Sequence, residues 1–186
     1  SICVPEPAAC LASFTPAYEI QGSGAASPLA GSVVTTQGIV VSDNEGPSPA
    51  LRGFYLQDAA GDGLSGTSDG IFVYHADLDT VDLGDEVRIT GTVSEYYGQT
   101  QVNATSVVFC EPGKSVSPGN LALPFPDLGV PERFEGMLVR LPQTLVVTEN
   151  YQLGRYGQVT LSFGDRLDQP TNVVAPGPAA LALQAQ

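Results

Sequence analysis

The sequence predicts an all-β protein built around a small closed β-barrel. The chain has 186 residues, of which 42% are hydrophobic, so it can bury a core of its own. It also contains 21 glycines and 15 prolines, a content typical of many short strands joined by turns. The third observation is a bent hairpin between residues 81 and 101, whose pattern suits the corner of a barrel.

That hairpin begins with a strand in which apolar and polar residues alternate. Its inward-facing row is Val87, Ile89 and Val93. Gly91 interrupts this row, and a glycine inside a strand indicates a bulge or a sharp bend. A turn at residues 97–99 then reverses the chain. A small barrel closed in this way is of the OB type, and OB barrels are mostly binding modules.

The elements follow in chain order. Residues 1–16 are rich in proline and alanine, and we expect them to form an extended lead-in. Residues 17–110 are predicted to form a five-stranded OB-like barrel. Its strands are predicted at residues 33–41, 53–57, 70–74, 86–95 and 101–109. No segment of this region shows the apolar spacing of a helix.

The rest of the chain is predicted to hold a linker and a second β unit. Residues 111–131 carry five prolines and are expected to be an extended linker. Residues 132–186 are expected to form a partial second OB-like unit with an Ala/Pro-rich tail. Its strands are predicted at residues 136–141, 144–148, 157–163 and 166–168. So few strands leave open sheet edges that could pair with another chain, giving self-association by strand donation.

The charge of the chain limits its partners. Twenty acidic residues against seven basic ones give a net charge of −13. Such a surface repels phosphate backbones, so nucleic-acid binding would need a bridging cation or a local basic patch. Solubility is the alternative reason for the charge. No apolar run of about 18 residues predicts a membrane span. Low lysine with abundant Asp, Thr, Ser and Gly is typical of a secreted bacterial protein.

The three cysteines predict one disulfide. They are Cys3, Cys10 and Cys110, without the paired spacing of a zinc site. A Cys10–Cys110 bridge would join the two chain ends of the barrel and close a long loop. A Cys3–Cys10 bridge is the alternative, and the odd cysteine would then be free or paired elsewhere.

An acidic loop is the candidate metal site. Asp58, Asp62 and Asp69 are separated by glycines and serines, and carboxylate oxygens are the ligands that calcium prefers. The spacing does not match an EF-hand, and aspartate with glycine is also the ordinary composition of a long turn. Calcium is therefore one interpretation of this loop, and a long turn is the other.

Exposed aromatic residues are the candidate nucleic-acid contacts. On an OB surface such side chains stack on bases, and strand alternation makes Tyr55, Tyr96 and Tyr97 the exposed ones. Gln99 lies beside them and could donate or accept hydrogen bonds. Arg155 lies in a polar loop of the second unit, where it could contact a phosphate or a neighbouring domain.

The sequence contains no catalytic set. His75 is the one histidine, and no G-x-S-x-G motif supports a nucleophilic triad. Four motifs nevertheless resemble a known region: EIQGSG from Glu19, GFYLQD from Gly53, FEGMLV from Phe134 and LGRYG from Leu153. They are similar to the OB-like accessory region of large bacterial extracellular nucleases, and matches of this kind extend over most of residues 18–172.

The resemblance implies a role but not an activity. In that family such modules precede an endonuclease/exonuclease/phosphatase-type domain that hydrolyses DNA or RNA with a divalent metal. The His and Asp motifs of that catalytic domain have no counterpart here, and the chain is expected to end inside the second module. We therefore expect a non-catalytic module that positions single-stranded or duplex nucleic acid, or the catalytic domain itself. The alternative is a structural module completed by strand donation between subunits, with no ligand of its own.

Overall fold

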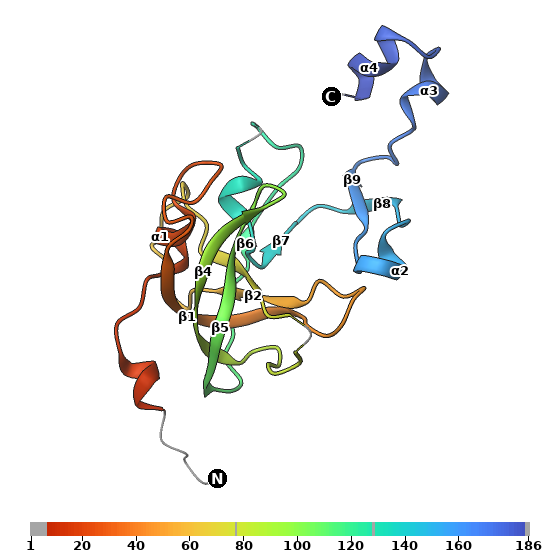
Figure 1. Cartoon of the computed structure of the whole chain (residues 1–186). Helices are drawn as coiled ribbons and strands as arrows, with labels where there is room; N and C mark the ends of the chain where they lie inside the picture. The colour runs from red at the N-terminus through yellow and green to blue at the C-terminus, as the bar shows by residue number, and fades with distance from the viewer. Residues whose placement is uncertain (1–6, 77, 128, 185–186) are drawn as a thin grey trace. The chain divides into compact units, whose positions relative to one another are not determined.

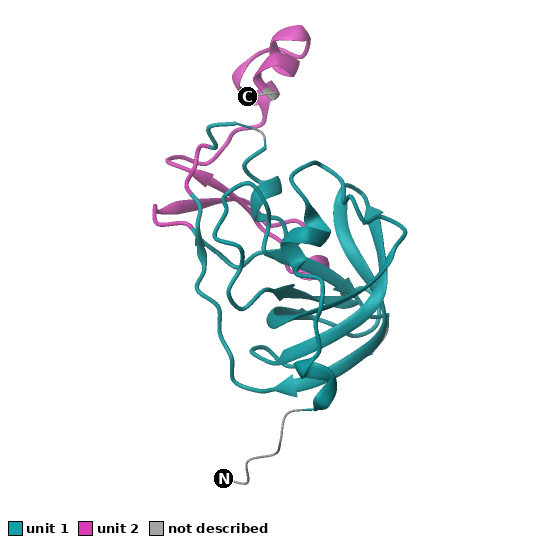
Figure 2. Ribbon diagram, turned by 90° about the vertical axis from the view of Figure 1, so that its left-hand side faces the viewer, with its two compact units in different colours: residues 1–121, 125–140 teal, residues 122–124, 141–186 magenta. Residues whose placement is uncertain are grey.

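The computed structural model describes residues 7–76, 78–127 and 129–184. The chain forms two units (Figure 2). Unit 1 consists of Ser1–Leu121 with Phe125–Arg140, and unit 2 consists of Ala122–Pro124 with Leu141–Gln186. In the part of the chain that the structure describes, no helix is long and apolar enough to cross a membrane.

Five strands of unit 1 close into a barrel (Figure 1). They are β1 (Val33–Asn44), β2 (Gly53–Gln57), β3 (Gly70–Tyr74), β4 (Glu86–Tyr96) and β5 (Gln99–Glu111). Their order around the ring is β1-β2-β3-β5-β4, and β4 pairs back onto β1. The β3–β5 pairing is parallel, and the other pairings of the ring are antiparallel. This is an OB-type barrel, so the predicted all-β fold class is confirmed.

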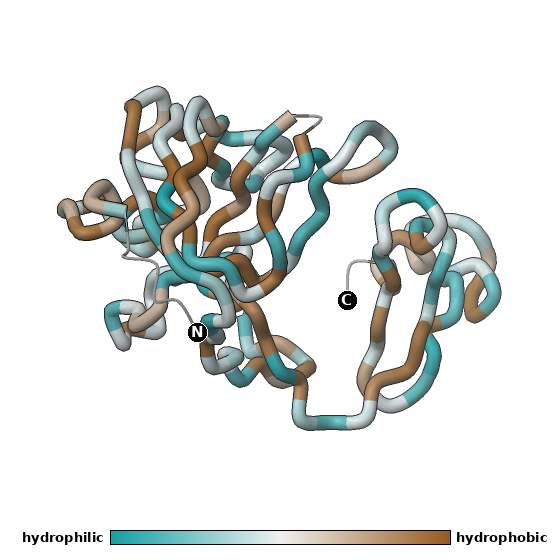
Figure 3. The backbone as a smooth tube through the Cα atoms, turned by 90° about the horizontal axis from the view of Figure 1, so that it is seen from below, coloured by the Kyte–Doolittle hydropathy of each residue, from teal (hydrophilic) through white to brown (hydrophobic). Residues whose placement is uncertain are grey.

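Alternating apolar residues of these strands fill the barrel. Phe54 and Leu56 of β2 and Ile71 and Val73 of β3 are fully buried in one cluster. Figure 3 shows apolar segments recurring along the barrel strands. The predicted bulge at Gly91 is confirmed, because the β4–β5 register shifts between Thr90 and this glycine. A side chain at Gly91 would collide with the backbone of the neighbouring strand.

A short lead-in closes one end of the barrel, and part of it is helical. It contains η1 (Ala8–Leu11) and α1 (Ala17–Gln21). The sequence prediction missed α1, because five residues are too few to show helical periodicity. The Asp58 carboxylate accepts a hydrogen bond from the first helical N–H, that of Ala17, at 3.0 Å.

The predicted disulfide joins the lead-in to the last barrel strand. Cys10 in η1 and Cys110 in β5 are bonded, with their Cα atoms 5.9 Å apart. The two residues are 100 positions apart in the chain, so the bond closes nearly the whole barrel into one loop. Cys3, the partner in the alternative pairing, lies outside the described residues.

The segment after the barrel returns to it and is called the strap here, residues 119–140. It contains β6 (Gly119–Asn120), η2 (Glu132–Phe134) and β7 (Val139–Arg140), with β6 and β7 paired in parallel. Unit 1 therefore includes residues 132–140, which the sequence prediction assigned to the second unit. Proline and glycine content showed that the segment is extended but not what it contacts.

Unit 2 contains one small sheet and three short helices. They are β8 (Leu145–Glu149), α2 (Leu153–Tyr156), β9 (Thr160–Phe163), α3 (Pro170–Val173) and α4 (Pro178–Gln184). β8 and β9 pair as an antiparallel hairpin. No strand forms at the predicted residues 166–168, and the tail, which showed no clear periodicity, is partly helical. The unit has too few strands to close, as the sequence predicted.

Candidate functional site

The β4–β5 turn carries the most exposed aromatic pair of the barrel. Tyr96 is 60% exposed and Tyr97 is 95% exposed, and their rings meet edge to face with centroids 4.7 Å apart. Tyr97 and Gly98 both have positive φ, 51° and 83°, which matches a two-residue hairpin turn of type I′. A tyrosine with positive φ is uncommon and strained, and such residues cluster at functional sites.

Tyr55 lies beside the base of this turn. It points out of the barrel from β2, because its neighbours Phe54 and Leu56 point into the core. Its hydroxyl accepts a hydrogen bond from Gln99 Nε2 at 3.1 Å, and its ring packs against Phe72 at 5.0 Å. Gln99 is the register partner of Tyr96. The fold therefore joins four residues that the sequence singled out, which are Tyr55, Tyr96, Tyr97 and Gln99.

A pocket of about 430 Å³ opens next to Tyr55 and is called the Tyr55 pocket here. Half of its lining comes from the barrel and half from the strap. The barrel contributes Val41, Ser42, Tyr55 and Gln99, and the strap contributes Gly136, Met137, Leu138 and Val139. The strap residues belong to the FEGMLV motif, but nothing in that motif indicates that it forms a pocket wall.

Hydrogen bonds hold the strap against the barrel. The Leu138 N–H donates to Gln57 Oε1 at 2.8 Å, and the Ser68 hydroxyl donates to the Glu135 carbonyl at 2.6 Å. The Glu135 carboxylate in turn accepts from the Thr100 N–H at 2.9 Å. Burial raises the pKa of Glu135, and the hydrogen bond from Thr100 acts in the opposite direction. These contacts reach β2, the β2–β3 loop and β5, so the strap covers part of the outer face of the barrel.

Two glycines let the strap approach so closely. A Cβ on Gly70 would collide with the carbonyl carbon and oxygen of Gly136. A Cβ on Gly136 would lie 2.9 Å from the Ile71 nitrogen, and Gly136 also has a positive φ of 70°. Both positions therefore require glycine for steric reasons.

The acidic loop forms internal turns. Asp58 accepts from the N–H of Ala17, and Asp69 accepts from the N–H of Asp62 at 3.3 Å. Asp62 accepts from the hydroxyl of Thr67 at 2.9 Å. No group of three His, Cys, Asp or Glu residues in the described ranges could hold a metal ion. The three carboxylates thus do not fit a calcium site, and they fit the alternative interpretation, a long turn.

Burial governs the ionisation of this loop. It raises the pKa of Asp58 to about 6, with further increases from Asp69 and Asp62, while the hydrogen bonds from Ala17 and Tyr18 lower it. Burial also raises the pKa of Asp69. A structural role at the end of α1 explains why Asp58 is buried there.

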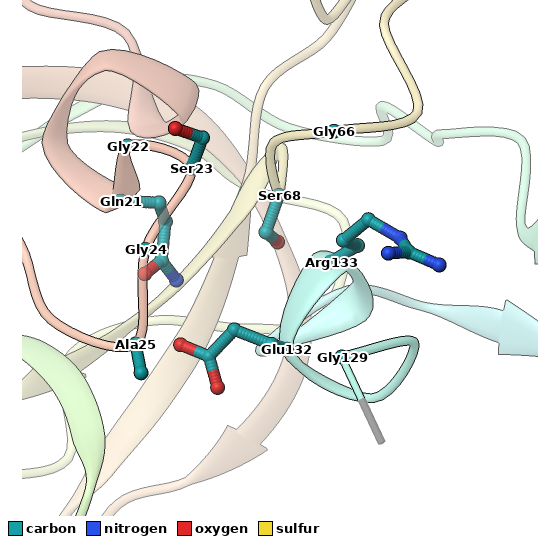
Figure 4. Close-up of a pocket in the computed structure, with 10 residues that line it drawn as sticks. All are labelled: Gln21, Gly22, Ser23, Gly24, Ala25, Gly66, Ser68, Gly129, Glu132 and Arg133. Atoms are coloured by element: carbon teal, nitrogen blue, oxygen red, sulfur yellow. The ribbon is translucent and has the colours of Figure 1, made fainter. Parts of the chain in front are cut away.

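A second pocket of unit 1, of about 470 Å³, has a different chemistry (Figure 4). It lies between the loop after α1, the loop before β3 and η2. Glu132 and Arg133 both line it, and Arg133 also faces Asp127 at 3.5 Å. None of the residues predicted as contacts lines this pocket, and we assign it no ligand.

Arg155 is exposed on α2 of unit 2. Its guanidinium lies over the ring of Tyr156, 5.2 Å from the centroid. It is not among the residues that line the Tyr55 pocket. The proposed phosphate contact at Arg155 therefore has no geometric support from the site in unit 1.

Comparison with known proteins gives little beyond the fold. No protein-family model matches the chain, and no curated protein matches it. The hypothetical protein ygiW from E. coli is similar in structure, with 21% identity over 43% of this chain and 76% of that chain, at a TM-score of 0.30. An OBody bound to hen egg-white lysozyme has 15% identity over 55% of this chain and 99% of its own, at a TM-score of 0.37. Scores this low carry no functional argument, and the OB assignment rests on the strand order.

Proposed function

We propose that unit 1 is a non-catalytic OB module of a secreted bacterial nuclease, and that it binds single-stranded nucleic acid. The observation that carries the proposal is the exposed Tyr96–Tyr97 pair, placed on a strained turn next to Tyr55 and Gln99. Tyrosine rings presented in this way are sequence-tolerant stacking platforms for bases. The Cys10–Cys110 disulfide is compatible with an oxidising compartment, which favours the secreted location.

The net charge of −13 sets how such binding would behave. Long-range repulsion of phosphate lowers affinity and slows association, so stacking and hydrogen bonding must supply the affinity. Added divalent cations would reduce that repulsion without a dedicated site. We therefore expect weak binding that improves with calcium or magnesium, in support of a catalytic domain elsewhere in the protein that holds the same strand.

The test is fluorescence anisotropy of a labelled single-stranded oligonucleotide, with and without calcium. Tyr97→Ala should weaken binding by about 1–3 kcal/mol, the usual value of one stacked base. Tyr151→Ala is the matched control, because Tyr151 is 82% exposed in unit 2. Absence of binding in every buffer, or equal losses in both variants, would overturn the proposal.

A second candidate function rests on unit 2. One face of the β8–β9 hairpin carries cross-strand apolar pairs, Val147 with Leu161 and Leu145 with Phe163. Phe163 is 55% exposed, and a lone two-stranded sheet is marginal in water. Strand addition from a second copy would make the protein an assembly module without its own ligand. Light scattering that finds only monomers at high concentration would exclude it.

A further inference from the structure

The strap changes what the barrel can bind. Without residues 136–139, the outward side of β2 would be an open surface around Tyr55. With them, that surface becomes a pocket of about 430 Å³, near the lower end of the range for small-molecule sites. The wall is fixed, because the Leu138 N–H is bonded to Gln57 and the close contact of Gly70 with Gly136 permits no side chain.

The lining of the Tyr55 pocket contains no charged side chain. Aliphatic groups come from Val41, Leu138 and Val139, while the Tyr55 ring and the flexible thioether of Met137 provide polarisable surfaces. A neutral lining in a chain of net charge −13 is selective, since it avoids the repulsion that the rest of the surface exerts on anions. The pocket therefore suits an uncharged, partly apolar group.

Three polar atoms remain available at the pocket. The Tyr55 hydroxyl accepts from Gln99 Nε2, so its own proton is free to be donated. The Ser42 hydroxyl accepts from Asn44 Nδ2 at 2.8 Å, and its proton is likewise free. Gln99 Oε1 has no partner among the described residues and can accept. Two donors and one acceptor around an apolar lining match the edge of an amide-containing heterocycle.

We infer that the Tyr55 pocket takes a single nucleobase, held as an uncharged planar ring between Tyr55 and Met137. This inference deepens the proposed function and rests on it: the tyrosine pair on the turn would stack on the strand, and the pocket would capture one base. The strap limits the pocket to one base, so the module would recognise a strand end or an unstacked base rather than a continuous run of nucleotides.

The chain contains one methionine, which makes the test direct. Protein labelled with ¹³C at the methionine methyl gives one signal, from Met137 in the pocket wall. Titration with the four neutral nucleosides should shift this signal in a saturable way, because a base stacked nearby exerts a ring-current effect. Ribose alone should leave it unchanged. A shift with ribose equal to that with nucleosides would overturn the inference.

A pair of variants tests the polar atoms. Tyr55→Phe removes one donor and should weaken nucleoside binding about five- to tenfold, the net value of one hydrogen bond. Tyr151→Phe removes a hydroxyl from unit 2 and should change nothing. Equal nucleoside affinity in the wild type and Tyr55→Phe would contradict the assigned contacts.

The oligonucleotide experiment separates the two proposals. If the oligonucleotide binds in a Tyr97-dependent way but no nucleoside shifts Met137, the pocket inference fails and the proposed function stands. If nucleosides shift Met137 but no oligonucleotide binds, the pocket is a base site and the proposed function fails. Binding by both supports both.

Discussion

Unit 1 has five strands paired in a closed ring, whereas the two strands β8 and β9 of unit 2 have one pairing between them. Both units use alternating apolar residues. In the barrel this pattern leaves Val87 and Ile89 fully buried, while Leu161 of β9 is exposed. In the described part of unit 2, Ser162 and Ala180 are the only buried residues. An amphipathic strand gains stability only when its apolar face is covered, and closing the ring provides that cover.

Removing one aromatic ring from each unit should show the largest contrast. Phe54 is fully buried in the barrel, so Phe54→Ala should cost about 3–5 kcal/mol of unfolding free energy. Phe163→Ala in unit 2 should cost less than about 0.5 kcal/mol, as for an exposed residue. Chemical denaturation followed by circular dichroism measures both. Similar losses would show that unit 2 has a buried core of its own.

Breaking the disulfide should destabilise unit 1 alone. The double variant Cys10→Ser with Cys110→Ser reopens a loop whose ends are 100 residues apart. Loss of this constraint on the unfolded chain should cost about 3–4 kcal/mol. Amide exchange resolved by residue is the measurement, with the wild type under reducing conditions as a second route to the same state. Faster exchange in unit 2 would contradict the separation of the units.

Acidification should stabilise unit 1. Because the pKa of Asp58 is raised to about 6, its contribution is fully present below the unfolded value near 3.8 and is lost as pH rises through 6. Stability should therefore increase by about 2 kcal/mol as pH falls from 7 to 4. Asp58→Asn should flatten this dependence, whereas Asp165→Asn in unit 2 should not. A wild-type stability that falls over this range would show the opposite sign for the group.

Two glycines with the same backbone conformation give the finest comparison. Gly136 in the strap and Gly157 in unit 2 have φ values of 70° and 67°, but an added Cβ meets the Ile71 backbone only at Gly136. Alanine at either position pays the left-handed conformation, about 1 kcal/mol. Gly136→Ala should cost about another 1 kcal/mol from crowding and should shift the Met137 methyl signal. Equal costs would mean that the strap adapts without strain.

The barrel could be predicted because its signals are local. The alternation in each strand, the bulge at Gly91 and the turn at Tyr97–Gly98 lie within a few residues of each other in the chain. The exposure of Tyr97 also follows from its place in a hairpin turn. The short helix α1 was missed because the Asp58 carboxylate, 41 positions from Ala17, caps its first turn.

The sequence by itself determined the strand positions, the all-β class, the disulfide partners and the aromatic turn, because period-two alternation and turn chemistry are properties of neighbouring residues. Tertiary structure alone decided that residues 132–140 belong with the barrel and that Met137 faces Tyr55 across a pocket. Leu138 donates to Gln57 through a backbone N–H, 81 positions away in the chain. A backbone donor is the same at nearly every residue, so no pattern in the sequence shows which acceptor it will meet.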